Sequence, residues 1–368
     1  MKRILKLSFV ILISVTIFSL CGCGYEYFDL NLEADYTNNL NGTVLNVYNW
    51  GEYISDGSDE SIDVNKEFER ITGIKVNYST FESNESMYSQ LRTAGVSYDV
   101  IIPSDYMIHR MINEDMLLPI DYSKITNYKN IDDKYKGLYF DSENKYTVAY
   151  NVGMVGVIYN TSMISDIEQS WGVFWDPKYK NQTLMFSNPR DAFMTAQFYS
   201  GTSVNSTNKA DWDKAVELLK AQKQYLQSYV MDEVYGKMET GEAAIAPYYA
   251  GDYLTMYEVN EDLAFFYPEE GTNIFVDAAC IPSCCQNYEA AMLYINFLLE
   301  PEIALANAEY IGYASPNTSV INNPDYYYYG NEILYPSEEQ MPKTEYYHDL
   351  NKDIRNYYEN LWIDVKLY

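Results

Sequence analysis

The fold is decided by residues 44–102, which read VLNVYNWGEYISDGSDESIDVNKEFERITGIKVNYSTFESNESMYSQLRTAGVSYDVII. Apolar residues in this stretch switch between the short or alternating runs of strands and the i, i+4, i+7 spacing of helices. The expected elements are a strand over 44–48, a helix over 64–71 closed by Gly73, a strand over 74–78, a helix between Ser83 and Gly95, and a strand over 100–102. Because strands that alternate with helices pair in parallel, the stretch predicts a parallel α/β sheet.

Polar and aromatic side chains follow two of these strands at their carboxyl ends. Ligands of parallel α/β sheets bind outside the carboxyl ends of the strands, so these side chains are candidates for a binding site. They are Trp50, Glu52 and Tyr53 after the first strand, and Ser104, Asp105 and Tyr106 after the third. Each strand end therefore offers an aromatic face beside a carboxylate.

The second half of the chain has the same character with less regular spacing. Helical faces are expected over 212–219 and 290–299, and short strands over 184–186 and 243–246. Two α/β lobes that face one another are the simplest architecture for a chain of 368 residues. A ligand would then bind in the cleft between the lobes.

The composition limits the kind of partner. The chain carries 53 acidic and 25 basic side chains, a formal net charge of −28. Nucleic acid and anionic lipid surfaces are excluded as favourable partners, because they are bound through clustered Lys and Arg. Tyr accounts for 40 residues, and its ring joins an apolar face to a hydrogen-bonding tip. Acids and such rings together suit a ligand that is both cationic and apolar.

The N-terminus predicts export and anchoring. Residues 1–23 have a basic leader, an apolar stretch and the sequence Leu20-Cys21-Gly22-Cys23, which looks like a bacterial lipoprotein box with Cys23 as the lipidated residue. An ordinary cleaved signal with incidental cysteines is the alternative. Residues 24–43 are expected to form a tether, and no later segment is apolar enough to span a membrane.

Motifs of catalysis and metal binding are lacking in the sequence. The chain has no G-x-S-x-G, no phosphate-binding glycine loop and no H-E-x-x-H, and it has only two histidines. Cys280, Cys284 and Cys285 allow at most one disulfide and do not have a zinc-binding spacing. The sequence therefore predicts a protein that is not an enzyme and that needs neither a cofactor nor a metal.

Several segments together carry a family resemblance, in the order in which they occur from about Val44 to the C-terminus. They are 47–53 (VYNWGEY), 72–76 (TGIKV), 78–85 (YSTFESNE), 99–104 (DVIIPS), 295–299 (INFLL) and 311–317 (IGYASPN). The chain resembles the periplasmic spermidine/putrescine-binding proteins of bacterial polyamine ABC importers.

This resemblance implies a two-lobed fold of the periplasmic-binding-protein type (type II), in which each lobe has a mostly parallel sheet flanked by helices. The first lobe would comprise 44–151 and 275–318, and the second 152–274 and 319–368. The implied partners are a polyamine, an ABC permease with its ATPase, and the lipid anchor. The protein would be a monomer on the outer face of the cytoplasmic membrane.

The ligand contacts of the family carry over residue by residue. They fall on Trp50, Glu52, Tyr53, Ser104, Tyr106, Asn188, Asp191, Tyr249, Phe275, Asp277, Tyr313 and Tyr347. Asn188 stands where the family has an acid, and Tyr249 and Phe275 stand where it has tryptophans. Asp105 is an additional acid that could compensate for Asn188. Asp277 is the foremost candidate for a salt bridge to an amine.

The chemistry of a polyamine matches these residues. Its ammonium groups need carboxylates, and its methylene stem needs apolar faces. The substitutions leave open whether putrescine or spermidine is preferred. Two other functions stay open as well: a receptor for a different cationic amine or an amino acid, and an extracellular lipid-anchored hydrolase.

Overall fold

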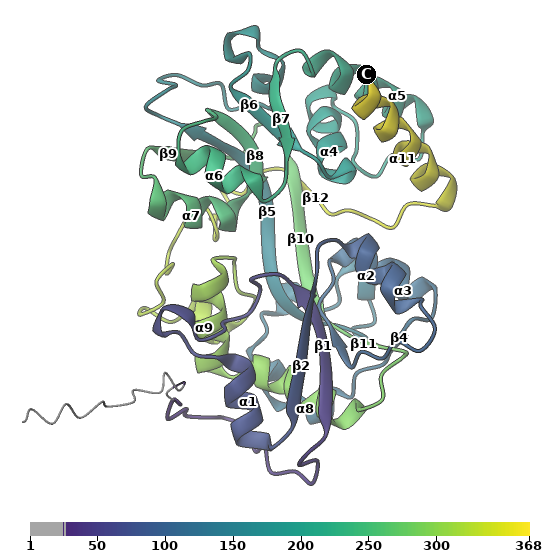
Figure 1. Ribbon diagram of the computed structural model, residues 1–368, viewed down its shortest axis with the longest axis vertical. Coiled ribbons are helices and arrows are strands. Elements are labelled where there is room, and N and C mark those ends of the chain that lie inside the picture. Colours follow the sequence, from purple (N-terminus) through teal and green to yellow (C-terminus); the bar gives the residue numbers. More distant parts are fainter. Residues whose placement is uncertain (1–24, 26) are drawn as a thin grey trace, which may run out of the picture.

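The computed structural model describes residue 25 and residues 27–368 (Figure 1). The first sheet has the order β2-β1-β3 and is parallel. Its strands are β1 (Val44–Trp50), β2 (Lys75–Phe81) and β3 (Val100–Ile101), which alternate with the helices α1 (Val64–Thr72), α2 (Asn84–Leu91) and α3 (Asp105–Asn113). The parallel α/β pattern expected for residues 44–102 is confirmed.

Local signals set the helix limits in this lobe. The Asp63 side chain accepts a hydrogen bond from the backbone of α1, and Gly73 ends the helix with a φ of 72°. Ser83 and Ser86 form reciprocal capping bonds at the start of α2. That helix ends at Leu91, before the expected Gly95, because the last residues of the segment form a turn.

Two long strands connect the lobes. β5 (Val148–Asn160) and β10 (Thr272–Ala279) are antiparallel neighbours that run through the centre of the molecule from one lobe to the other (Figure 1). Beyond β10 the chain pairs with β3 through Cys280 and then forms β11 (Ile281–Pro282), which pairs with β4 (Leu117–Leu118). The segment that follows β10 therefore continues into the first lobe and pairs there with β3 and β4.

The second lobe contains the remainder of the seven-stranded sheet, with the order β12-β10-β5-β8-β6-β7 and with β9 also paired to β5. Its other strands are β6 (Thr183–Phe186), β7 (Leu226–Val230), β8 (Ile245–Tyr249), β9 (Leu263–Phe266) and β12 (Thr344–Glu345). Strands are thus confirmed at both expected places, with the second displaced to 245–249.

Helices surround both sheets (Figure 1). Those of the second lobe are α4 (Pro189–Ser200), α5 (Lys209–Gln222), α6 (Glu233–Glu239), α7 (Ala250–Val259) and α11 (Lys352–Leu367). The first lobe also has α8 (Tyr288–Leu298), α9 (Pro301–Ile311) and the short α10 (Thr318–Ile321). Short 3-10 helices occur at Ser58–Glu60, Tyr122–Lys124, Thr126–Asn130, Asp133–Tyr135, Tyr139–Asp141, Trp171–Trp175 and Pro177–Tyr179.

The segment before β1 is attached to the first lobe. The Glu300 carboxylate is fully buried and accepts hydrogen bonds from the Tyr36 hydroxyl at 2.8 Å, from Ala34 N at 3.0 Å and from Asn127 Nδ2 at 2.8 Å. Residues 27–43 of the expected tether are hydrogen-bonded to the first lobe, through Glu300 before α9 and through Glu67 of α1, which accepts from Phe28 N at 2.8 Å. Sequence composition indicated a spacer, but the acceptors come from distant parts of the chain.

Three cysteines fall within the described residues, whereas the predicted lipidation site does not. Cys280 is fully buried, and Cys280, Cys284 and Cys285 are all free thiols. No group of His, Cys, Asp and Glu within residues 25 and 27–368 is arranged to hold a metal ion. In that same part of the chain no helix is long and apolar enough to cross a membrane. Cys23 lies outside the described residues.

Candidate ligand-binding site

Asp277 lies on β10 in the region where that strand passes between the lobes. Its side chain is buried, with 3% of the residue surface exposed. Oδ2 accepts a hydrogen bond from the Tyr53 hydroxyl at 2.6 Å, and Oδ1 has no hydrogen bond within 3.5 Å from the described residues, although an interaction with the Ser104 side chain lowers the pKa of Asp277. Burial raises the pKa of Asp277 to about 6. A carboxylate in this state gains most from a cationic hydrogen-bond donor.

A second carboxylate is held by the other lobe. Asp191 lies in the first turn of α4 and is 4% exposed. Its Oδ2 accepts from the Tyr249 hydroxyl at 2.7 Å and from Asn188 Nδ2 at 2.8 Å, and its Oδ1 accepts from the Tyr347 hydroxyl at 2.8 Å. Burial raises its pKa. Asn188 thus supplies an amide that binds Asp191.

Aromatic rings connect these two carboxylates. Tyr53 contacts Tyr313 with ring centroids 5.6 Å apart, Tyr313 lies 6.1 Å from Phe275, and Phe275 lies 5.6 Å from Tyr249. Tyr106 of the first lobe similarly meets Tyr347 at 6.2 Å. Rings from both lobes therefore form a continuous series between Asp277 and Asp191.

Two glycines allow these rings to approach the backbone. Gly153 faces Phe275 across the β5–β10 ladder, and a Cβ at that position would lie 2.2 Å from the Phe275 ring. Gly251, at the start of α7, has the same relation to Tyr313, at 2.4 Å. Any larger residue at either position would displace the ring.

Asp252 is a third carboxylate, which the sequence reasoning missed. Its Oδ2 accepts from the Tyr313 hydroxyl at 2.5 Å, and its other oxygen accepts from the Tyr235 hydroxyl. Desolvation raises its pKa to about 6. A signal for it exists, because Asp252 and Asp191 occupy the same position, three residues after the cap, in helices that follow the adjacent strands β8 and β6.

The remaining candidates are less directly connected. Ser104, the N-cap residue of α3, forms an isolated β-bridge with Asp277. Asp105 is fully buried, and its oxygens accept from the amides of Tyr106 at 2.6 Å and Val276 at 3.4 Å. Burial raises the pKa of Asp105 well above its ordinary value. Asp105 thus joins α3 to β10.

Trp50 and Glu52 are predicted site residues, but neither makes a direct contact with these acids and rings. The Trp50 ring lies 4.5 Å from Phe81, and its buried Nε1 has no acceptor among the described residues. Glu52 is exposed and has a φ of 52°, in the left-handed region. Burial, Asp252 and, more weakly, Glu52 raise the pKa of Tyr235.

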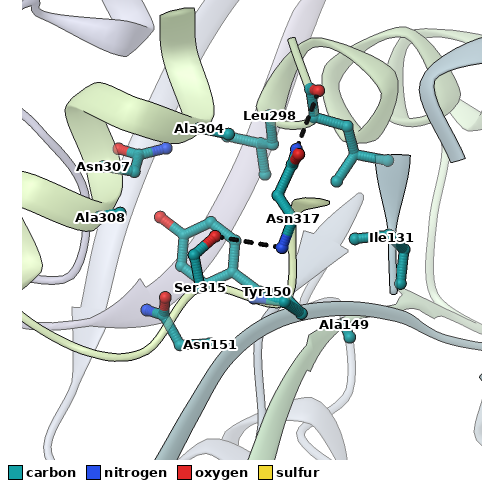
Figure 2. Close-up of a pocket in the computed structure, with 12 residues that line it drawn as sticks. Ile131, Ala149, Tyr150, Asn151, Leu298, Ala304, Asn307, Ala308, Ser315 and Asn317 are labelled. Atoms are coloured by element: carbon teal, nitrogen blue, oxygen red, sulfur yellow. Dashed lines mark hydrogen bonds between the residues drawn. The ribbon is translucent and has the colours of Figure 1, made fainter. Parts of the chain in front are cut away.

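A small cavity lies beside this site in the first lobe (Figure 2). Its volume is about 20 Å³, and its lining includes Tyr150, Asn151 and Asn307. The amide nitrogens of both asparagines are buried and have no acceptor among the described residues. The cavity has room for one water molecule and not for an alkylamine. The Tyr150 hydroxyl donates to Tyr53 O at 2.8 Å and so helps to fix the position of Tyr53 in the site.

Two α/β lobes joined by crossing strands, with acids and rings from both lobes in one group, define a solute-binding protein. Residues 64–331 match the family of bacterial extracellular solute-binding proteins, and the chain belongs to this family. The two-lobed fold expected from the sequence is confirmed.

More specific relatives carry polyamine names. The spermidine/putrescine-binding periplasmic protein of Salmonella typhimurium is 33% identical over 324 residues, which cover 88% of this chain and 91% of the relative. The putrescine-binding periplasmic protein PotF of Escherichia coli is 27% identical, with 74% and 78% covered. A solved structure, the putative spermidine/putrescine ABC transporter from Listeria monocytogenes, superposes with a TM-score of 0.83 at 36% identity and covers 89% of this chain and 99% of that one.

Proposed function

We propose that this protein is the extracytoplasmic receptor of an ABC importer and that it binds a polyamine between its lobes. The observation that carries the proposal is the buried Asp277 carboxylate, whose Oδ1 has no hydrogen bond within 3.5 Å from the described residues. An ammonium group supplies both the positive charge and the hydrogen bond that this oxygen lacks. The names of the relatives support the same ligand class.

The series of rings between the two acids suggests the form of the ligand. Asp277 marks one end of the series of rings and Asp191 the other, so a cation with two ammonium groups joined by methylenes can pair with both. The rings of Tyr53, Tyr313 and Phe275 lie between them and offer faces to the methylene stem and to the ammonium groups. Putrescine and spermidine both have this form.

Other residues receive supporting roles in the proposal. Asp252 adds a negative charge beside Tyr313. Asp105 positions β10 and Ser104 rather than touching the ligand, because its oxygens are engaged by backbone amides. Trp50, Glu52 and Tyr106 close the site from the first lobe.

The same proposal includes the cellular setting. Cys23 is the lipidated residue, the protein is a monomer on the outer face of the cytoplasmic membrane, and it delivers its ligand to a permease with its ATPase. Mass spectrometry of the protein from membranes tests the anchor. Lipidated Cys23 as the first residue supports it, whereas an unmodified N-terminus elsewhere contradicts it.

Calorimetric titration tests the ligand. Putrescine, cadaverine, spermidine and spermine are compared with lysine and γ-aminobutyrate, which carry a carboxylate that the acidic site repels. The expected result is saturable one-to-one binding of at least one polyamine, with the amine recovered unchanged. Binding of an amino acid alone, or conversion of the amine, would contradict the proposal.

A further inference from the structure

A basic groove lies at the junction of the two lobes, away from the acidic site. It has a volume of about 340 Å³ and is lined by Arg92, Arg110, Glu114, Lys352, Arg355, Asn356 and Glu359. Arg92 directly follows α2 and Arg110 lies on α3, both in the first lobe. Residues 352–359 belong to α11 of the second lobe. Figure 1 shows α11 above α2 and α3 on one side of the molecule.

The concentration of positive charge is unusual for this chain. Four cations and two acids line the groove, in a protein whose net charge is −28. Arg110 is paired with Glu114 at 3.0 Å, and Arg355 is paired with Asp349. In residues 25 and 27–368, no carboxylate lies within ion-pair distance of Arg92 or Lys352, although the charge of Arg92 helps to lower the pKa of Glu114. One unpaired cation therefore comes from each lobe.

The first-lobe side of the groove is also held in place. The Arg110 guanidinium lies 3.9 Å from the centroid of the Tyr88 ring, and Arg92 Nη1 donates to the Tyr88 hydroxyl at 3.0 Å. The same hydroxyl donates to Glu114. Stacked and hydrogen-bonded guanidinium groups lose less freedom when they bind an anion than free side chains do.

We propose that this groove binds a small multivalent oxyanion, such as phosphate or a di- or tricarboxylate, between the unpaired cations of the two lobes. Its volume suits such an anion, and guanidinium groups match the geometry of carboxylate and phosphate oxygens. An occupant that contacts both lobes favours the arrangement in which they are close together. This coupling to the amine site rests on the proposed function. Because coupling between two sites is reciprocal, the anion and the polyamine each raise the affinity of the protein for the other by the same factor.

Titration of citrate and of phosphate into the protein tests the site without any polyamine. Chloride at equal ionic strength is the reference, because surface charge is screened by any salt. The test variant is Arg92→Gln/Lys352→Gln, and the control Lys75→Gln/Lys180→Gln removes one exposed lysine from each lobe instead. We expect saturable binding that weakens at least tenfold in the test variant and is unchanged in the control. Absence of saturable binding, or equal loss in both variants, would overturn the site.

The coupling is read in a second titration, in which polyamine is added with citrate or with chloride at the same ionic strength. A higher polyamine affinity in citrate, lost in Arg92→Gln/Lys352→Gln, supports the coupling. Equal polyamine affinity in both salts refutes it. If no polyamine binds at all, the proposed function fails, but the anion titration still shows whether the groove binds an oxyanion.

Discussion

Asp277→Asn is the substitution with the most informative consequences, because it removes a charge and keeps the shape. In the complex, Asp277 would pair with a buried ammonium group. Removing one partner of a buried, hydrogen-bonded charge pair costs about 2–5 kcal/mol, or roughly 30-fold to several-thousand-fold in affinity. The Tyr53 hydroxyl can still donate to the amide oxygen, so its 2.6 Å bond is retained.

The stability of the ligand-free protein should increase in Asp277→Asn, although its affinity for the polyamine falls. A pKa raised from 3.8 to about 6 means that charging this buried group costs stability, which is lost progressively as the pH rises from 3.8 to about 6. At about 1.4 kcal/mol per pH unit, that cost is about 3 kcal/mol at neutral pH and vanishes below the unfolded value. Asn carries no charge, so part of this stability is regained at pH 7.5 and none at pH 3.5.

Calorimetry and thermal melting of the same samples measure both effects. Asp325→Asn, an exposed acid outside the site, is the matched control and should change neither. The reasoning predicts weaker polyamine binding together with a higher melting temperature of the ligand-free protein. Unchanged affinity in Asp277→Asn would refute the role of this carboxylate, and a lower melting temperature would refute its desolvation.

Three further outcomes follow from the structure. Polyamine affinity should fall at least tenfold between pH 7.5 and pH 5, because burial raises the pKa of Asp277 and of the neighbouring Asp252 to about 6, so that the site loses negative charge below that pH; a flat titration profile would contradict this. Gly153→Ala should weaken binding about 5- to 150-fold, since overpacking against Phe275 costs about 1–3 kcal/mol; equal affinity would show that the ring position is unimportant. Glu300→Ala should destabilise the first lobe by about 3 kcal/mol in denaturant unfolding, because several buried donors lose their acceptor. Its polyamine affinity should stay unchanged, and weakened binding would link the N-terminal segment to the site.

The sequence predicted those parts of the fold that depend on local patterns. The strand and helix order of residues 44–102 follows from apolar spacing and from Gly73, and it was confirmed. The long strand β5 was not singled out, because Val148–Asn160 is almost entirely buried and lacks the alternation of a strand with one solvent face. The attachment of residues 27–43 could not be predicted, because it depends on Glu300, which is distant in the chain.

Prediction of the binding site was limited in the same way, because its contacts also join residues that are distant in the chain. Aligned segments indicated Asp277, Asp191 and most of the rings, but they could not show that the Tyr53 hydroxyl binds Asp277 or that Asn188 binds Asp191. Asp252 lies outside the aligned segments, and its only signal is its place in the first turn of the helix that Tyr249 caps. Which acids share one site depends on how the two lobes meet, which local sequence does not determine.

A crystal structure of the protein with spermidine or putrescine tests the central claim most directly. The account predicts an ammonium nitrogen about 2.7–3.2 Å from Asp277 Oδ1, with the methylene stem against the rings of Phe275 and Tyr313. An amine bound elsewhere, with that oxygen in contact with no cation, would contradict it.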